Sequence, residues 1–383
     1  MRIAYYAPLK PVDHPVPSGD RLMARAFMAL LETLGHRVEI ASTLRSFDRA
    51  GDRAQQLALK GRAAIEQRRL LEEFARRSAP DLWFTYHAHH KAPDWLGPAV
   101  CRSLGIPYVI AEASIAGKQA GGPWDIGHLA TVEAVNAASA VLALTDVDAR
   151  NLRRYMSDPT RLFLFPPFIQ TRAGNPGERD APRRDLAREL GLSTDPVWLV
   201  TVAMMRKDIK LDSYRLLAAA LAGVASADWR LLVIGDGEAG AEVRELLLAV
   251  AGERVRFLGE RPPAEVARLC LAGDVFVWPA LREAYGMAIL EALAAGLPVV
   301  ACDDGGVADL VAHESNGLLA TAGAADELAA HLDRLIGDPD LRRRMGRQAA
   351  ARVAERHSHD AAAARLRSVL THVAEQAGRA PCT

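Results

Sequence analysis

Two glutamates eight residues apart, Glu283 and Glu291, carry the most informative chemistry in this sequence. Tyr285, Gly286 and Met287 lie between them and lead into a predicted helix that ends near Gly296. A helix that begins beside a glycine exposes free backbone N–H groups, which bind phosphate well. An ionised carboxylate can accept hydrogen bonds from two neighbouring hydroxyls, so Glu283 suits a sugar and Glu291 suits a ribose. The pattern therefore indicates a site for a phosphate and a sugar.

A basic loop follows the strand predicted over residues 197–204. Its cations are Arg206 and Lys210, with Lys207 as a competing candidate. The 47 basic residues of the chain are 41 arginines and six lysines, so two lysines in one loop favour a function over a merely solvated surface. Two cations in one loop can stabilise negative charge on a ligand.

Polar residues also gather after strands in the first half of the chain. His87, His89 and His90 follow one strand and could bind a metal. However, their side chains alternate in direction and the sequence fixes no acidic ligand beside them, so we expect no metal and favour sugar or acceptor contact by His87 or His89. Lys118 lies in a glycine-rich loop that suits an anionic acceptor, or that is an ordinary surface loop.

The elements that position these residues alternate between short apolar strands and longer helices throughout. Continuous apolar runs of four to six residues are typical of parallel strands that are covered on both faces. The pattern predicts an α/β fold with two doubly wound, Rossmann-like sheets. The strands are predicted over residues 2–6, 37–41, 82–86, 108–111, 140–144, 162–165, 197–204, 230–234, 255–258, 275–278, 298–302 and 317–320.

A stretch rich in proline, glycine and charge, residues 171–184, interrupts this alternation and is predicted to be a linker. The expected domains are residues 1–170 and 185–359. The C-terminal segment, residues 360–383, begins with a helix that either packs on the second domain or crosses back to the first. Ligands of such sheets bind beyond the carboxyl ends of the strands, so a cleft between the two domains is the expected active site.

Composition narrows the class of protein. The chain has 383 residues, 50% of them hydrophobic, and 47 basic residues balance 47 acidic ones. The neutral charge gives no global attraction to nucleic acid. No apolar run reaches the ~20 residues that span a bilayer, and four scattered cysteines argue against a disulfide framework. We expect a cytoplasmic protein. The arginine-rich helix predicted over residues 54–77 either touches the inner face of the membrane or is a solvated helix with a core-facing stripe. Its predicted apolar side consists of Leu57, Ala58, Ile65, Leu70, Leu71 and Phe74.

The segment from Glu283 to Glu291, followed by Ala292-Leu293-Ala294-Ala295-Gly296-Leu297-Pro298-Val299-Val300, resembles the donor-site motif of retaining glycosyltransferases of the GT-B fold, family four (glycosyl transferases group 1). The resemblance covers nearly the whole chain. It implies two Rossmann-like domains that face each other across a cleft, with a UDP- or GDP-sugar as co-substrate and no metal or cofactor. The acceptor would be a glycan, a lipid or a small molecule.

The resemblance also implies roles for individual residues. Arg206, Lys210 and Glu283 would be catalytic, and the two cations would hold the donor diphosphate, on which negative charge builds as the glycosidic bond breaks. His87, His89, Glu112 and Lys118 would contact the acceptor or the sugar. The donor would be bound by Gly19, Gly235, Arg261, Tyr285, Gly286, Met287 and Glu291.

The sequence departs from this family in the first domain. Ser18-Gly19 stands where the family usually has two glycines. Ala113 stands where family members often carry a histidine near the donor sugar, so Glu112 or Ser114 would take over that contact.

The favoured function is transfer of a hexosyl unit to an acceptor hydroxyl with retention of configuration. The alternatives are a nucleotide-sugar epimerase, a phosphorylase, or a non-catalytic relative that binds nucleotide sugars. A phosphorylase would be expected to carry lysine-bound pyridoxal phosphate, for which the sequence has no signature. The sequence leaves the oligomeric state open.

Overall fold

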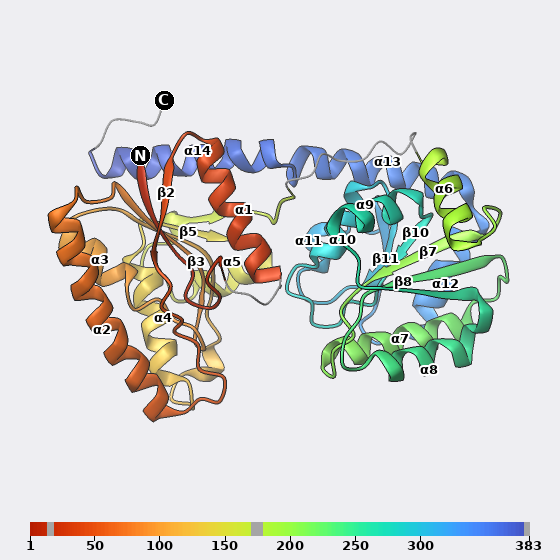
Figure 1. Cartoon of the computed structure of the whole chain (residues 1–383), viewed down its shortest axis with the longest axis horizontal. Coiled ribbons are helices and arrows are strands. Elements are labelled where there is room, and N and C mark those ends of the chain that lie inside the picture. The colour runs from red at the N-terminus through yellow and green to blue at the C-terminus, as the bar shows by residue number, and fades with distance from the viewer. Residues whose placement is uncertain (14–18, 170–178, 379–383) are drawn as a thin grey trace. The chain divides into compact units, whose positions relative to one another are not determined.

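The computed structural model describes residues 1–13, 19–169 and 179–378. The chain divides into two compact units, Met1–Pro167 with His359–Thr383 and Phe168–Ser358. Each unit is built around one six-stranded parallel sheet with helices on its faces (Figure 1). The two doubly wound α/β sheets that the alternation predicts are confirmed.

The sheet of unit 1 has the strand order β2-β1-β3-β4-β5-β6. Its central strands are buried on both faces, which explains why they are continuous apolar runs in the sequence. The strands are β1 (Arg2–Tyr6), β2 (Arg37–Ser42), β3 (Leu82–His89), β4 (Tyr108–Ser114), β5 (Ala140–Ala143) and β6 (Leu162–Leu164).

The helices of unit 1 pack mainly in two groups. Helices α2 (Arg53–Arg76), α3 (Gly97–Leu104) and α4 (Asp125–Ala137) contact one another, whereas α1 (Gly19–Thr33) contacts α14 (His359–Gln376). The shorter helix α5 (Asp146–Arg153) packs beside β4 and β6. Thus the C-terminal helix belongs to the first unit, although 191 residues of unit 2 precede it in the chain.

The sheet of unit 2 has the strand order β12-β11-β10-β7-β8-β9. The strands are β7 (Val197–Val202), β8 (Trp229–Ile234), β9 (Val255–Gly259), β10 (Val275–Val277), β11 (Val299–Cys302) and β12 (Gly317–Ala320). Helices α7 (Ile209–Gly223), α8 (Gly240–Ala251) and α12 (Ala325–Gly337) form one contacting group. The other group contains α6 (Asp180–Leu190), α9 (Pro263–Ala272), α10 (Met287–Ala294) and α13 (Pro339–Arg356), and the short α11 (Val307–Leu310) contacts α10.

Each sheet has one point at which the strand order reverses. In unit 1 it lies between β1 and β3, and in unit 2 between β7 and β10. The loops that leave two such neighbouring strands run to opposite faces of the sheet, so a crevice opens between them at the carboxyl ends. Ligands of doubly wound sheets bind there, which directs attention to the residues that follow β1, β3, β7 and β10.

Two predictions about elements need correction. Part of the predicted linker lies outside the described residues, but its end at residues 180–184 is the first turn and a half of α6. In α2 the predicted apolar side is right at Leu70 and Phe74, which are buried, but wrong at Leu57 and Ile65, which are more than half exposed. The other buried residues of this helix are Gln56, Leu59 and Ala63. None of the described helices combines the length and apolar composition needed to cross a bilayer.

Candidate active site

Two glycines join the loops that follow β7 and β8 in unit 2. A Cβ atom on Gly235 would lie 2.0 Å from the carbonyl oxygen of Ala203, and one on Gly237 would lie 2.5 Å from that of Met205. Backbone hydrogen bonds from the Met205 N–H to Asp236 and from the Ala239 N–H back to Met205 close the junction. The predicted importance of Gly235 therefore has a structural cause, since only glycine allows this close approach.

The lysine predicted to face the diphosphate lies at the strand-order reversal. Lys210 follows β7, and its Nζ forms an ion pair and hydrogen bond with the carboxylate of Glu283, which follows β10. The same Nζ lies 5.6 Å from the centre of the Trp278 ring. Both side chains of the pair are about four-fifths buried. Two catalytic candidates that are 73 residues apart in sequence thus meet where the topology predicts a ligand.

The backbone around Glu283 is held by the loop that follows β11. The Gly306 N–H donates to the Glu283 carbonyl, and the Arg282 N–H donates to the carboxylate of Asp304 at 2.8 Å. Ala280 and Arg282 both have positive φ, which is costly for residues other than glycine. The strain indicates that the fold fixes the position of Glu283 instead of letting the loop relax.

Helix α10 begins directly after this loop. Gly286 is its N-cap in the left-handed conformation, with φ 70° and ψ 64°, and Met287 is its first residue. The first backbone N–H groups of a helix have no partner inside it, so this end can accept an anion. Tyr285 is buried just before the cap.

Glu291 lies on the next turn of α10. Burial raises the pKa of its carboxyl above the ordinary value. Among the described residues no cation pairs with Glu291, so its ionised form is costly in this poorly hydrated place. Such a perturbed carboxyl is typical of a functional site.

The remaining candidates of unit 2 have local partners of their own and form no ion pair with Lys210 or Glu283. The Nε of Arg206 forms an ion pair with Asp208 at 3.0 Å, and nearly half of the Arg206 side chain is exposed. Arg261 follows β9 and pairs with Glu265 at 3.5 Å. The competitor Lys207 is exposed, and its backbone N–H donates to Glu238. Arg206 is available to a ligand in the loop beside Gly235.

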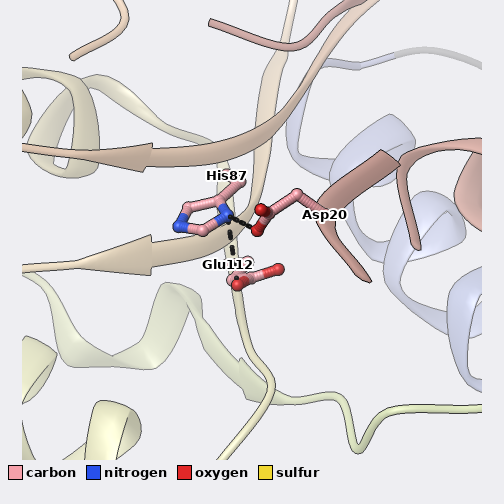
Figure 2. Close-up of side chains that lie close together, drawn as sticks. All are labelled: Asp20, His87 and Glu112. Carbon is pink, nitrogen blue, oxygen red and sulfur yellow. Dashed lines mark hydrogen bonds and ion pairs between the residues drawn. The ribbon is translucent and has the colours of Figure 1, made fainter. Parts of the chain in front are cut away.

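In unit 1 the strand-order reversal brings together a histidine and two carboxylates. The Nδ1 of His87 lies 3.0 Å from Asp20 Oδ1 and 3.3 Å from Glu112 Oε1. His87 is near the end of β3, Glu112 is opposite it on β4, and Asp20 is in the first turn of α1 (Figure 2). The other ring nitrogen points away from both carboxylates (Figure 2). His87 and Glu112 both have positive φ, so the backbone is strained where these side chains meet.

The two carboxylates determine the charge of His87. Burial disfavours the charged ring, but Glu112 and then Asp20 outweigh it and raise the pKa of His87 to about 8. Burial and the neighbouring His87 hold the pKa of His89 well below its ordinary value. At neutral pH the cluster therefore contains one imidazolium beside one neutral imidazole, and His87 can donate a hydrogen bond through its outward nitrogen.

The sequence-based argument that no acidic ligand is fixed beside the histidines is wrong. Asp20, His87 and Glu112 each offer one ligand atom, and these atoms lie within 4.8 Å of one another. A nitrogen and two oxygens could bind a divalent cation. The 3.0 Å between His87 Nδ1 and Asp20 Oδ1 is also a normal hydrogen-bond distance. A protonated His87 ring beside the two carboxylates therefore explains the cluster without a bound metal ion.

The other residues of unit 1 that the sequence singles out do not belong to this cluster. Ser18 is outside the described residues, and Gly19 is exposed at the start of α1. Lys118 is exposed in a short helical turn. Asp20 was not assigned a role from the sequence, although its place directly after Gly19 is a signal for a residue at a strand-end loop.

Similarity to known proteins agrees with this arrangement. A family model described as glycosyl transferases group 1 matches residues 183–352. The D-inositol 3-phosphate glycosyltransferase of Frankia alni is 30% identical, with 72% of this chain and 71% of that protein covered. That of Segniliparus rotundus is 30% identical over 69% of this chain. The alpha-D-kanosaminyltransferase of Streptomyces kanamyceticus is 28% identical over 65% of this chain. The chain spans only 61% and 64% of the length of these last two relatives.

Solved structures share the fold at lower identity. A glycosyltransferase from Rickettsia africae superposes with a TM-score of 0.75 at 16% identity, covering 97% of this chain and 98% of the other. HepE from Anabaena, solved with UDP, gives a TM-score of 0.71 at 20% identity, covering 97% and 99%. The two sheets, the matched model and the Frankia relative together show that this chain has the GT-B fold and belongs to the family of glycosyl transferases group 1.

Proposed function

We propose that this protein is a retaining glycosyltransferase that moves a hexosyl unit from a UDP- or GDP-sugar to an acceptor hydroxyl. The observation that carries the proposal is the meeting of Lys210 and Glu283 at the strand-order reversal of unit 2, beside the N-terminus of α10. A cation, a carboxylate and free backbone N–H groups in one crevice suit a ligand that combines a diphosphate with hydroxyls.

The leaving diphosphate is the centre of the proposed chemistry. When the bond between the sugar C1 and the phosphate oxygen breaks, the electron pair stays with the diphosphate. Lys210, Arg206 and the N-terminus of α10 then stabilise its added negative charge. The acceptor hydroxyl forms the new bond to C1 on the same face, and its proton passes to the leaving phosphate oxygen. No metal is required, because the protein supplies the positive charge itself.

The carboxylates would orient the donor. Glu283 holds the Nζ of Lys210 before any ligand arrives. An ammonium group has three hydrogens, so Lys210 can keep this bond and still donate to a phosphate. Glu283 can in turn accept from a sugar hydroxyl, while the partly buried Glu291 accepts from the ribose hydroxyls.

The cluster of unit 1 is the proposed acceptor-side or sugar-side contact. Ala113 is buried and carries no polar group at the position where the family often has a histidine. The outward nitrogen of His87, held by Asp20 and Glu112, would supply a hydrogen-bond donor instead. HepE was solved with UDP-glucose. The name of the first relatives gives D-inositol 3-phosphate, a hydroxylated molecule, and that of the Streptomyces enzyme gives a kanosaminyl group as the sugar transferred. These names favour a nucleotide-sugar donor and a hydroxylated acceptor.

Release of UDP or GDP from a panel of UDP- and GDP-sugars tests the proposal. We expect turnover of at least one donor, and Arg206→Ala and Lys210→Ala should each lower kcat by about 100-fold, as loss of one charge-stabilising donor does elsewhere. Arg215→Ala is the matched control, because Arg215 is an exposed cation on the same helix that pairs with Asp212 and Glu242. Its turnover should be unchanged.

Full turnover in both Arg206→Ala and Lys210→Ala would refute the diphosphate assignment. Tight binding of a nucleotide sugar without release or transfer from any panel member would instead indicate a non-catalytic relative. Conversion of one sugar nucleotide into another without nucleotide release would indicate an epimerase.

A further inference from the structure

A second concave site in unit 2 lies at the amino ends of the strands, opposite the candidate active site. A cavity of about 640 Å³ is lined by the first turns of α6 and α13, by the start of β7 at Val197 and by Asp274, which precedes β10. Lys210 and Glu283 follow the carboxyl ends of β7 and β10, whereas this cavity lies at their amino ends. Thus it is separated from the candidate active site by the length of the strands.

The wall of the cavity is an arginine network around one buried carboxylate. Asp274 forms ion pairs with Arg179 and Arg183, and Arg342 lies 3.8 Å from it. The backbone N–H of Trp198 also donates to Asp274 at 2.8 Å. One negative charge therefore faces three guanidinium groups.

Two arginines of this network, Arg183 and Arg342, also donate hydrogen bonds to backbone carbonyls. Arg183 donates to the carbonyl oxygens of Thr194, Pro196 and Ala272 and lies over the Trp198 ring. Arg342 donates to the carbonyls of Leu335 and Ile336. These bonds fix where the two side chains lie but add no negative charge. Burial lowers the pKa of both Arg183 and Arg342, which shows that their positive charge is costly in this place.

The lining as a whole carries excess positive charge. Five arginines line the cavity, and Asp180, Asp195 and Asp274 are its acidic residues. Because Asp340 outside the lining offsets one of the two remaining positive charges, one stays uncompensated. Arg184 is exposed and has no ion-pair partner within the described ranges. Arg343 is exposed and pairs with Asp340. An adjoining cavity of about 370 Å³ shares Arg179, Asp274, Arg342 and Arg343 and adds Arg347.

We propose that this cavity is a binding site for a small polyanion that carries phosphate groups. Guanidinium groups match phosphate oxygens in pairs, and several arginines fixed around one hollow suit a ligand with two or more negative charges. A bound anion would also offset the cost of the uncompensated positive charge. The concave shape and limited volume favour a small molecule over a polymer or a membrane surface.

Titration calorimetry with inorganic tripolyphosphate at physiological salt tests this proposal on the full chain. The cavity variant is Arg184→Gln/Arg343→Gln, which removes two exposed charges and leaves Arg179, Arg183 and Arg342 in place. The matched control is Arg188→Gln/Arg344→Gln, which removes the same charge from the same two helices at residues that do not line the cavity. We expect the cavity variant to weaken binding about tenfold or more and the control to leave it nearly unchanged.

The same comparison in an Arg206→Ala/Lys210→Ala background separates this cavity from anion binding at the candidate active site, and we expect the same difference there. Equal affinities for the cavity variant and the control, or no binding by the unmodified chain, would overturn the proposal. Tighter binding of citrate than of tripolyphosphate would overturn the phosphate class. Cosedimentation with anionic phospholipid vesicles, without binding of tripolyphosphate, would show that these arginines bind a membrane surface instead.

Discussion

At the scale of single residues, substitution of the partly buried Glu291 should affect stability and nucleotide binding in opposite directions. Because burial raises its pKa, ionisation of Glu291 at neutral pH costs the folded state free energy. This cost grows as pH rises from the pKa of the unfolded chain to that of the folded protein. Glu291→Gln should therefore keep or raise Tm at pH 7, yet weaken UDP or GDP binding about tenfold by removing a charged acceptor.

The control for this prediction is Glu245→Gln, because Glu245 is exposed on α8 of the same unit. It should change neither quantity. Thermal unfolding and nucleotide titration give the two readouts. Unchanged nucleotide affinity in Glu291→Gln would show that this residue does not contact the ribose.

The raised pKa of His87 leads to a second prediction about a single residue. Its pKa of about 8 in the folded protein exceeds the ~6.5 of an unfolded chain. The protonated ring thus stabilises the fold fully below pH ~6.5, and this contribution is lost as pH rises through 8. An NMR titration of the ring should give a pKa near 8. Glu112→Gln should lower that pKa, whereas Glu133→Gln, a change at an exposed residue of α4, should not.

A His87 pKa at or below ~6.5 would contradict the two-carboxylate account of the cluster. So would a titration that Glu112→Gln leaves unchanged. Because the readout is the pKa of one ring, loss of a merely structural contact elsewhere would not produce the expected shift.

Residue types and spacing select Lys210 and Glu283, which the fold brings together, and His87 and Glu112, but they miss Asp20. Glu283 and Lys210 carry their own signals, a carboxylate before a helix and a rare lysine after a strand. The contact of Asp20 with His87 spans 67 residues and depends on β1 lying beside β3. The local sequence pattern does not predict which strands are neighbours, because strand order depends on how the whole sheet packs.

At the scale of elements, the junction of the β7 and β8 loops is the feature on which the site depends. Gly235 has φ 136°, and a Cβ there would collide with the backbone of Ala203. Gly235→Ala should lower the free energy of unfolding by about 1–3 kcal/mol, the usual cost of a strained backbone position. It should also weaken nucleotide binding, because the displaced loop carries Arg206.

Gly337→Ala is the matched control, since Gly337 ends α12 with open space around it and no positive φ. Denaturant unfolding and nucleotide titration compare the two variants. A Gly235→Ala protein that is as stable and binds as tightly as the Gly337→Ala protein would contradict the role given to the junction.

Helices and strands follow from the apolar pattern, and the errors have physical causes. The end of the predicted linker is helical because Pro182 lies in the first turn of α6, where a missing N–H is tolerated. Only Leu186 and Ala187 of that helix are buried, so it has little apolar signal. In α2 the exposed Leu57 and Ile65 break the stripe, and the pattern alone does not show which side faces the sheet.

At the scale of the whole molecule, each unit has a candidate site at the reversal of its strand order. The alternation of strands and helices predicts two doubly wound sheets, but it does not reveal that one has the order 2-1-3-4-5-6 and the other 3-2-1-4-5-6, each counted from its own first strand. Nor does it choose a unit for α14, whose contacts with α1 depend on the folded surface. Local pattern fixes the elements, whereas topology arises from their packing.

Retention of configuration at the sugar C1 can be read from the anomeric configuration of a trapped product. Methanol can serve as a surrogate acceptor, because a methyl glycoside does not interconvert between anomers as a free sugar does. With an α-linked UDP- or GDP-hexose as donor, NMR should show the methyl α-hexoside together with free UDP or GDP, and Lys210→Ala should form both about 100-fold more slowly. A methyl β-hexoside would contradict the proposed retaining mechanism.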